Sequence, residues 1–126
     1  AETRAILESS VSRSAAVFNL SRAALLVNAL NTGNFSHLRI ATQDALHQQT
    51  REKNFRPLSA TIQAALNAGA LGAFLSGAGP TVMAITSERQ MTIGYEMSDA
   101  ASKFGVDGEI RILEPAPYGC QVIRTQ

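Results

Sequence analysis

The stretch "LGAFLSGAGPTVMAI", Leu71 to Ile85, sets two short apolar runs on either side of a glycine-rich centre. Leu71–Leu75 and Thr81–Ile85 contain the bulky and β-branched residues that are typical of strands. Gly77 and Gly79 between them provide backbone conformations with positive φ, which tight turns require. The stretch therefore predicts a β-hairpin, and the rest of the fold is predicted around it.

The glycine-rich centre of this stretch has two interpretations. It lacks the third glycine of a dinucleotide-binding loop, and no Gly-Lys-Ser/Thr follows it. It also leads into a strand, so no helix N-terminus is available there to hold an anion. A tight turn is the favoured interpretation. The alternative stays open, because glycines also let a ligand or another polypeptide approach the backbone closely.

Three helices are predicted before the hairpin. The first covers Ser12–Leu30 and ends at the Asn31-Thr32-Gly33 stop signal. Because its apolar residues lie on every side, we expect it to be mostly buried. The second covers about Phe35 to Gln48, and the third Pro57–Asn67. The polar connection between these two helices is the first place to look for function.

A fourth helix and two strands are predicted after the hairpin. Ser87-Glu88-Arg89-Gln90 matches a capping box, and the helix that follows it ends at Gly105. The strands cover Glu109–Leu113 and Gly119–Arg124. This order predicts an α+β fold: a ferredoxin-like sandwich with an antiparallel sheet of about four strands, helices packed on it and a helix-rich N-terminal half. Residues 1–126 are predicted to form a single domain.

The composition excludes several classes of protein. The chain has 126 residues, of which 45% are hydrophobic and 17% charged, and its formal net charge is +1. We therefore expect a folded domain that binds neither nucleic acid nor a membrane surface. One cysteine, Cys120, excludes an internal disulfide and fits a reducing compartment. The chain begins at Ala1 on a helix-like segment, so a piece of a longer protein is an expectation as well.

The residues offer binding groups more readily than catalytic ones. His37, His47 and Cys120 match no metal-ligand spacing, and no nucleophile elbow or paired-carboxylate motif is visible. We therefore predict no metal ligand and no catalytic residue in this chain.

The arginines are the most informative polar residues, since nine of the 11 basic residues are arginine. Arg51 lies in the polar connection, where its guanidinium could reach a ligand carboxylate, although a solvated loop arginine is the alternative. The same two interpretations apply to Arg4. Arg22 and Asn19 lie on the apolar face of the first helix and need partners there. For Arg22 a buried ion pair or bonds to backbone carbonyls are favoured over a ligand.

Three segments of the chain resemble, in order, the C-terminal half of homoserine kinases. They are "FNLSRAALLVNAL" (Phe18 to Leu30), "LHQQTR" (Leu46 to Arg51) and "AGALGAFLSGAGPTVMAI" (Ala68 to Ile85). These enzymes belong to the superfamily named for galactokinase, homoserine kinase, mevalonate kinase and phosphomevalonate kinase. The resemblance implies transfer of the ATP γ-phosphate to the hydroxyl of L-homoserine, in threonine biosynthesis, with Mg²⁺. It also implies a cytoplasmic protein, or one of the plastid stroma in a plant-like organism.

The resemblance implies that a separate N-terminal ATP-binding domain is needed. Its serine-rich nucleotide loop has no counterpart in these 126 residues. The chain is then the C-terminal domain alone, and we expect it neither to bind ATP or Mg²⁺ nor to phosphorylate homoserine unaided. Family members are often dimers, so a homodimer is a further expectation.

The resemblance also implies roles for particular residues. Arg4 and Arg51 match two arginines that clamp the homoserine carboxylate, although Gln49-Thr50 replaces the expected Pro-Tyr before Arg51. Asn19 and Arg22 match an Asn-Leu-x-Arg motif, and we expect them to be structural supports. The glycine motif, which in the family backs the phosphate loop of the other domain, consists here of Ser76, Gly77, Ala78, Gly79, Pro80 and Thr81, with Ala78 in place of a serine.

Two alternatives to a homoserine kinase remain. One is another kinase of the same superfamily, of the mevalonate or diphosphocytidyl-methylerythritol type, whose substrate carries a different anionic group. The other is a stand-alone amino-acid-binding or dimerisation module.

Overall fold

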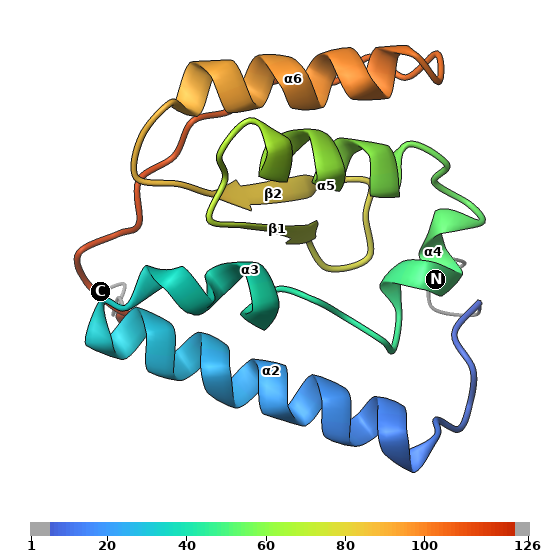
Figure 1. The fold of residues 1–126 in the computed structure, drawn as a ribbon, viewed down its shortest axis with the longest axis vertical. Helices are drawn as coiled ribbons and strands as arrows, with labels where there is room; N and C mark the ends of the chain where they lie inside the picture. Colours follow the sequence, from blue (N-terminus) through green and yellow to red (C-terminus); the bar gives the residue numbers. More distant parts are fainter. Residues whose placement is uncertain (1–5, 123–126) are drawn as a thin grey trace.

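A computed structural model describes residues 6–122 of the chain. Two antiparallel strands, β1 (Gly72–Leu75) and β2 (Val82–Ile85), form the sheet, with Gly72 opposite Ile85 and Leu75 opposite Val82. Helices α5 (Leu58–Asn67) and α6 (Gln90–Ser102) lie against this hairpin on one side (Figure 1). The predicted hairpin is confirmed.

Small residues hold the helices close to the hairpin. The core is a cluster in which Ile93 of α6 is the only large buried side chain and the other members are alanines of α5, of β1 and of the chain between them, namely Ala65, Ala68, Ala70 and Ala73. Ala84 of β2 packs against the cluster. Because alanine has only a methyl group, the backbone of α5 approaches both strands of the hairpin and α6 closely.

The first predicted helix is confirmed as α2 (Arg13–Thr32). The Ser12 side chain accepts a hydrogen bond from the Ala15 N–H at 3.1 Å, and Gly33 ends the helix with φ of 70°. The expectation that this helix is mostly buried is wrong. Of its residues only Ala29 is fully buried, because α2 packs against the short helices that follow it and turns its other side outward (Figure 1).

The second predicted helix, Phe35 to Gln48, is broken into three pieces. A single 3₁₀ turn, η1 (Phe35–His37), leads into α3 (Leu38–Ala41), and α4 (Gln48–Glu52) follows after an irregular segment. The Thr42 hydroxyl donates to the Leu38 carbonyl at 2.9 Å and competes with the helix, while the Asp44 carboxylate accepts from the Gln48 N–H, at the first residue of α4. These side-chain bonds to the backbone overrule the helical spacing of the apolar residues.

The third predicted helix is confirmed as α5, with Pro57 just before its first residue and Gly69 after it at φ of 108°. The helix predicted after the hairpin is confirmed as α6, but the capping box is wrong. Arg89 occupies the cap position with φ of 61° and no side chain caps the helix. The Thr86 hydroxyl instead bonds to the Glu88 backbone, and this turn replaces the box.

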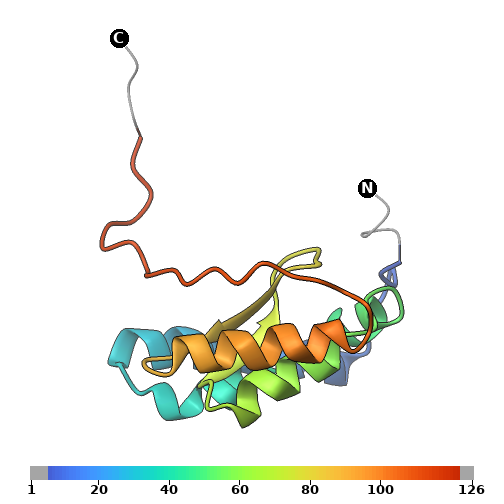
Figure 2. The ribbon, with the colours of Figure 1, turned by 90° about the horizontal axis from the view of Figure 1, so that it is seen from above.

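The two strands predicted after α6 do not form among the described residues. Glu109–Leu113 and the described part of the last strand run as extended chain without backbone pairing, beyond the helices (Figure 2). A strand is stable only when its backbone groups have a neighbouring strand to bond to. Ile110 instead lies against Gly94 of α6. The α+β class is confirmed, whereas the described residues form a two-stranded sheet and not one of four strands.

Among the described residues, no helix combines the length and the apolar character that a membrane crossing requires.

Gly72 provides a test of the packing between α3 and the sheet. A Cβ at this position would lie 2.8 Å from Thr42 Cγ2 and 3.0 Å from the Leu38 carbonyl oxygen. We expect Gly72→Ala to lower the stability of the full-length protein by about 1–3 kcal/mol, because the backbone of α3 must shift. Urea unfolding measures the change. The matched control is Gly108→Ala, where a Cβ meets no atom within 4 Å. Equal stabilities of the two variants would contradict the packing.

Candidate functional site

Arg51 is the central residue of the candidate site. It lies on α4 with only 7% of its surface exposed, and its Nη1 donates to the Ala78 carbonyl of the glycine loop at 2.8 Å. Its Nε is buried and has no hydrogen-bond partner in the described part of the chain. Arg51 is also absent from the ion pairs formed within residues 6–122. A buried guanidinium with an unused N–H is therefore held beside the loop.

Asp44 positions the helix that carries Arg51. Its Oδ2 accepts hydrogen bonds from the backbone N–H groups of Leu46, His47 and Gln48 at 3.1, 2.7 and 2.8 Å. Gln48 is the first residue of α4, so its N–H has no partner within the helix, and Leu46 and His47 come directly before it. The carboxylate thereby fixes where α4 begins and which way it runs, and a negative charge there also suits the helix dipole.

Asn19 connects this cap to the long helix. Its side-chain nitrogen donates to Asp44 Oδ1 at 2.6 Å, and its oxygen accepts from the Ala45 N–H at 2.8 Å. One amide side chain on α2 therefore holds both the carboxylate and the adjacent backbone of the irregular segment.

Gln48 connects α4 to the sheet. Its side-chain oxygen accepts from the Leu75 N–H at 2.7 Å, at the end of β1 where the glycine loop begins. Gln48 and Arg51, one helical turn apart, therefore hold the two sides of one junction: Gln48 the last residue of the strand, and Arg51 the loop at Ala78.

Internal hydrogen bonds also shape the glycine loop. The Ser76 N–H donates to the Thr81 carbonyl at 2.8 Å and closes the loop, and the Gly79 N–H donates to the Ser76 carbonyl at 3.3 Å. Gly77 and Gly79 have φ of 59° and 80°, and the Gly79–Pro80 peptide bond is cis. Ala78 and its neighbours through Thr81 are exposed, and a Cβ added at Gly77 would meet nothing within 4 Å. The loop presents open backbone to its surroundings.

Of the other arginines singled out from the sequence, Arg22 makes no hydrogen bond to this junction among the described residues. Arg4 lies outside the described residues. Arg22 stacks over the Phe18 ring, with its guanidinium carbon 3.6 Å from the ring centre, and its Nη1 donates to Ser21 Oγ at 3.0 Å. Arg22 therefore packs on an aromatic face, and within residues 6–122 it has neither of the favoured partners, an ion pair or a backbone carbonyl.

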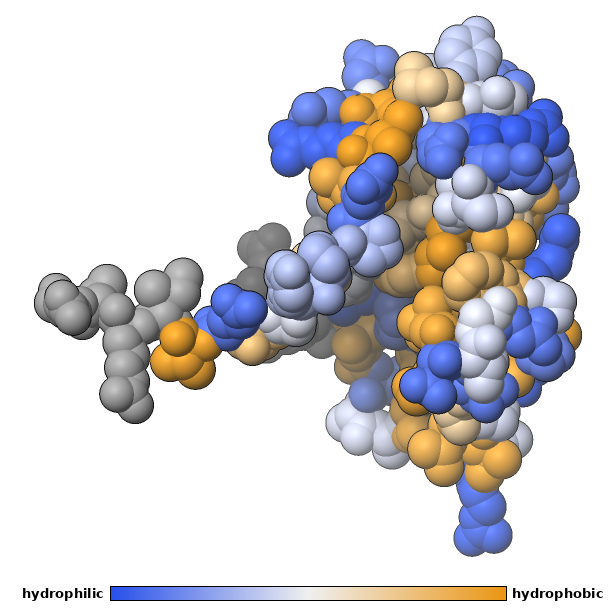
Figure 3. Space-filling model, turned by 90° about the vertical axis from the view of Figure 1, so that its left-hand side faces the viewer, coloured by the Kyte–Doolittle hydropathy of each residue, from blue (hydrophilic) through white to orange (hydrophobic). Residues whose placement is uncertain are grey.

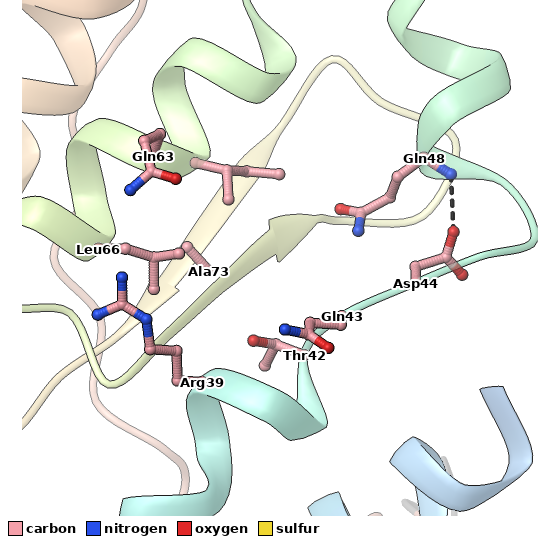
Figure 4. A pocket seen from close by; sticks show the side chains of 9 residues that line it. Arg39, Thr42, Gln43, Asp44, Gln48, Gln63, Leu66 and Ala73 are labelled. Carbon is pink, nitrogen blue, oxygen red and sulfur yellow. Dashed lines mark hydrogen bonds between the residues drawn. The ribbon is translucent and has the colours of Figure 1, made fainter. Parts of the chain in front are cut away.

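A groove lies beside the Asp44 cap, between the irregular segment and α5 (Figure 4). Its volume is about 320 Å³, and its lining includes Arg39, Gln43 and Gln63. Polar side chains from the segment and from α4 face Gln63 and Leu66 of α5 across it (Figure 4). The groove separates α5 from the segment that carries Asp44.

Burial alone would raise the pKa of the Asp44 carboxyl. The hydrogen bonds from the Gln48 and His47 N–H groups and from the Asn19 amide outweigh burial and lower the pKa below the ordinary 3.8. His47, whose Nε2 lies 3.6 Å from the carboxylate, acts in the same direction. The charged form of Asp44 is therefore the form that the fold stabilises.

Neither Asp44 nor Gln48 is among the site residues predicted from the sequence. A signal was present for Asp44: an acidic residue a few positions before a Gln-Gln-Thr-Arg run can be a helix cap. The continuous apolar spacing from Phe35 to Gln48 obscured it. Gln48 had no signal, because its partner Leu75 is far along the chain.

The described residues contain no group of three or more His, Cys, Asp or Glu side chains that could hold a metal ion. What the junction offers chemically is a fixed guanidinium beside an open glycine loop, which suits binding of an anionic group.

Comparison with known proteins shows which family contains this domain. Residues 24–101 match the family of GHMP kinases C-terminal domains, and this range includes Asp44, Arg51 and the glycine loop. The chain belongs to the GHMP kinase family. This agrees with the resemblance carried by the three sequence segments.

Several relatives of this GHMP-family chain bear a more specific name. The homoserine kinase of Aquifex aeolicus is 41% identical over 122 residues, and that of Desulfitobacterium hafniense is 40% identical over 123 residues. These alignments cover 96% and 97% of this chain but only 41% of either relative. The chain thus spans less than half the length of the relatives that it matches.

A solved structure supports the fold. The crystal structure of homoserine kinase from Cytophaga hutchinsonii superposes with a TM-score of 0.77 at 28% sequence identity. The match covers 82% of this chain and 33% of that structure.

The Asp44 cap predicts a pH-dependent stability. The folded pKa lies below the unfolded value, so the stabilisation is complete above about pH 4 and is lost as the pH falls through the lower, folded pKa. We expect Asp44→Ala to cost about 1 kcal/mol at pH 7, because three N–H groups lose their acceptor. The difference between wild type and variant should shrink towards pH 2, as measured by urea unfolding.

The exposed acidic residue Asp107 provides the control for this experiment. Asp107→Ala should change stability by less than about 0.5 kcal/mol at either pH. A pH-independent effect of Asp44→Ala would show that the charge of the carboxylate does not stabilise the cap.

Proposed function

We propose that this chain is the C-terminal half of a homoserine kinase, which transfers the γ-phosphate of ATP to the hydroxyl of L-homoserine and gives O-phospho-L-homoserine. The observation that carries the proposal is Arg51, a buried cation with an unused N–H beside the glycine loop. The homoserine kinases among its relatives add support. In this proposal residues 1–126 form one domain, and the activity belongs to a longer protein.

Arg51 is proposed to bind the carboxylate of homoserine. Its Nη1 already donates to the Ala78 carbonyl, which leaves the Nε side of the guanidinium for a ligand. A charge-assisted bond from a fixed guanidinium orients an amino acid and so places its hydroxyl for transfer. Because phosphoryl transfer depends mainly on positioning and charge stabilisation, this is a substantial contribution. Arg4 is proposed as a second clamp on the same carboxylate.

The glycine loop is proposed to receive the phosphate-binding loop of the ATP-binding half. The open space beside Gly77 fits such an approach, because a side chain there would fill it. ATP and Mg²⁺ would supply the phosphoryl group and neutralise its charge in the complete enzyme. We assign none of their ligands to the described residues and propose that the 126-residue chain does not phosphorylate homoserine by itself.

Arg51→Ala in the full-length protein tests the proposal. We expect kcat/KM for homoserine to fall about 10²-fold, since the substrate carboxylate loses its charged partner, while the KM for ATP changes little. Steady-state phosphorylation assays with each substrate varied in turn measure both. The exposed Arg56, replaced by alanine, is the matched control and should leave both constants unchanged.

Two outcomes would contradict different parts of the proposal. Wild-type protein that phosphorylates mevalonate or diphosphocytidyl-methylerythritol, and not homoserine, would overturn the substrate. Equal losses for homoserine and ATP in Arg51→Ala would show that Arg51 supports the fold of the loop and does not bind substrate.

Gly77→Ala tests the role of the glycine loop. Gly77 and Gly33 both have positive φ, of 59° and 70°, and a Cβ meets nothing within 4 Å at either position. The two alanine substitutions should therefore cost similar stability, about 1 kcal/mol. We expect only Gly77→Ala to reduce kcat strongly, by tenfold or more, because its methyl group enters the space proposed for the phosphate loop. Similar kcat values for the two variants would contradict this assignment.

A further inference from the structure

The outer edge of β1 is bonded by a side chain at its last residue. In an antiparallel pair, successive N–H groups of a strand point alternately towards its partner and away from it. The Ser76 N–H donates to the Thr81 carbonyl at 2.8 Å, on the side of β2, so the preceding N–H, that of Leu75, points to the outer edge. There it donates to the Gln48 side-chain oxygen at 2.7 Å. The Gln48 amide therefore takes the place of a neighbouring strand where β1 ends.

Gln48 is held at its backbone as well as at its side chain. It is the first residue of α4, and its N–H donates to Asp44 Oδ2 at 2.8 Å. Figure 4 shows this bond, with the Gln48 side chain extending from α4 towards the hairpin. Because Asp44 is in turn bonded to Asn19 on α2, Gln48 has a fixed base from which to hold the strand.

Leu75 carries this restraint into the glycine loop. It is buried, with 4% of its surface exposed. A Cβ added at Gly79 would lie 3.3 Å from Leu75 Cδ1, so the loop backbone rests directly on this leucine. In a close-packed contact, a shift of one group moves the other. Two side chains of α4 therefore set the loop at adjacent residues: Gln48 through Leu75 at Gly79, and Arg51 by its own bond at Ala78.

We infer that Gln48 is a positioning residue for phosphoryl transfer, acting through Leu75 on the glycine loop. The inference rests on the proposed function, in which this loop receives the phosphate-binding loop of the ATP-binding half and Arg51 binds the substrate carboxylate. Gln48 then sets the nucleotide side of the site without touching either substrate, while Arg51, one turn later on the same helix, sets the homoserine side. Transfer depends steeply on such placement, because displacing the reacting groups by about 1 Å costs a factor of about 100 in rate.

Gln48→Met in the full-length protein tests this role, because methionine has a similar length and no amide oxygen to accept from the Leu75 N–H. We expect kcat for homoserine phosphorylation to fall about tenfold. The Kd of the β,γ-methylene analogue of ATP, measured by isothermal titration calorimetry with Mg²⁺, should rise about threefold or more, and the Kd of homoserine should change less than about twofold. Gln49→Met is the matched control: Gln49 is exposed on the same helix and should leave all three values unchanged.

Calorimetry separates this role from a merely structural one. A substitution that only unfolds part of the protein lowers the stoichiometry of analogue binding and leaves the affinity of the remaining sites unchanged, whereas Gln48→Met should keep the wild-type stoichiometry. A second measurement combines Gln48→Met with Gly77→Ala. Since both are expected to act on one loop, kcat of the double variant should lie within about twofold of the lower single value.

The outcomes distinguish the role of Gln48 from the proposed function. An unchanged analogue Kd in Gln48→Met, a loss of stoichiometry alone, or multiplicative effects of the two substitutions on kcat would each overturn the role of Gln48. A wild type that binds the analogue and does not phosphorylate homoserine would instead overturn the proposed function. The analogue titration then still decides whether Gln48 positions the loop, because it requires no homoserine.

Discussion

The candidate site depends on one carboxylate. Asp44 accepts hydrogen bonds from backbone N–H groups at the start of α4 and from the side-chain amide of Asn19. These bonds outweigh the effect of burial and lower the pKa of the carboxyl, so the charged form is favoured. Without this acceptor, the five residues of α4 have no reason to form a helix, since a helix that short is not stable by itself. Arg51, near the end of α4, would then lose its fixed place beside the glycine loop.

A chain of hydrogen bonds therefore joins parts of the molecule that are far apart in sequence. It runs from Asn19 on α2 through Asp44 to α4, and from α4 through Gln48 to β1 and through Arg51 to Ala78. Every link has one partner on the backbone or on a short side chain, so the geometry leaves little freedom. A guanidinium held in this way is already positioned before any ligand binds, which is the condition for effective anion recognition.

The surfaces left uncovered are as informative as the site. The outward side of α2 and the extended segment after α6 both expose large apolar side chains (Figure 3). The chain spans less than half of the relatives that it matches, and among the described residues the Glu109–Leu113 segment pairs with no strand and the glycine loop is open.

The sequence by itself determined the local elements that short-range chemistry controls. Ser12 and Gly33 bound the long helix, Pro57 and Gly69 bound α5, and the glycines between two apolar runs make the hairpin. It also carried the family resemblance and drew attention to Arg51. Each of the boundary and turn signals lies within a few residues of the element that it specifies.

Only the tertiary structure decided the features that depend on contacts between distant parts of the chain. The break in the Phe35–Gln48 helix depends on Asn19, 25 residues before Asp44. The hydrogen bond that holds Arg51 beside the glycine loop is made to Ala78, 27 residues further along, and the outward face of α2 depends on which of its sides α3 covers. The strands expected after α6 have no pairing partner among the described residues. Helical periodicity and strand propensity cannot report such contacts, because they describe a segment alone and not the groups that meet it in space.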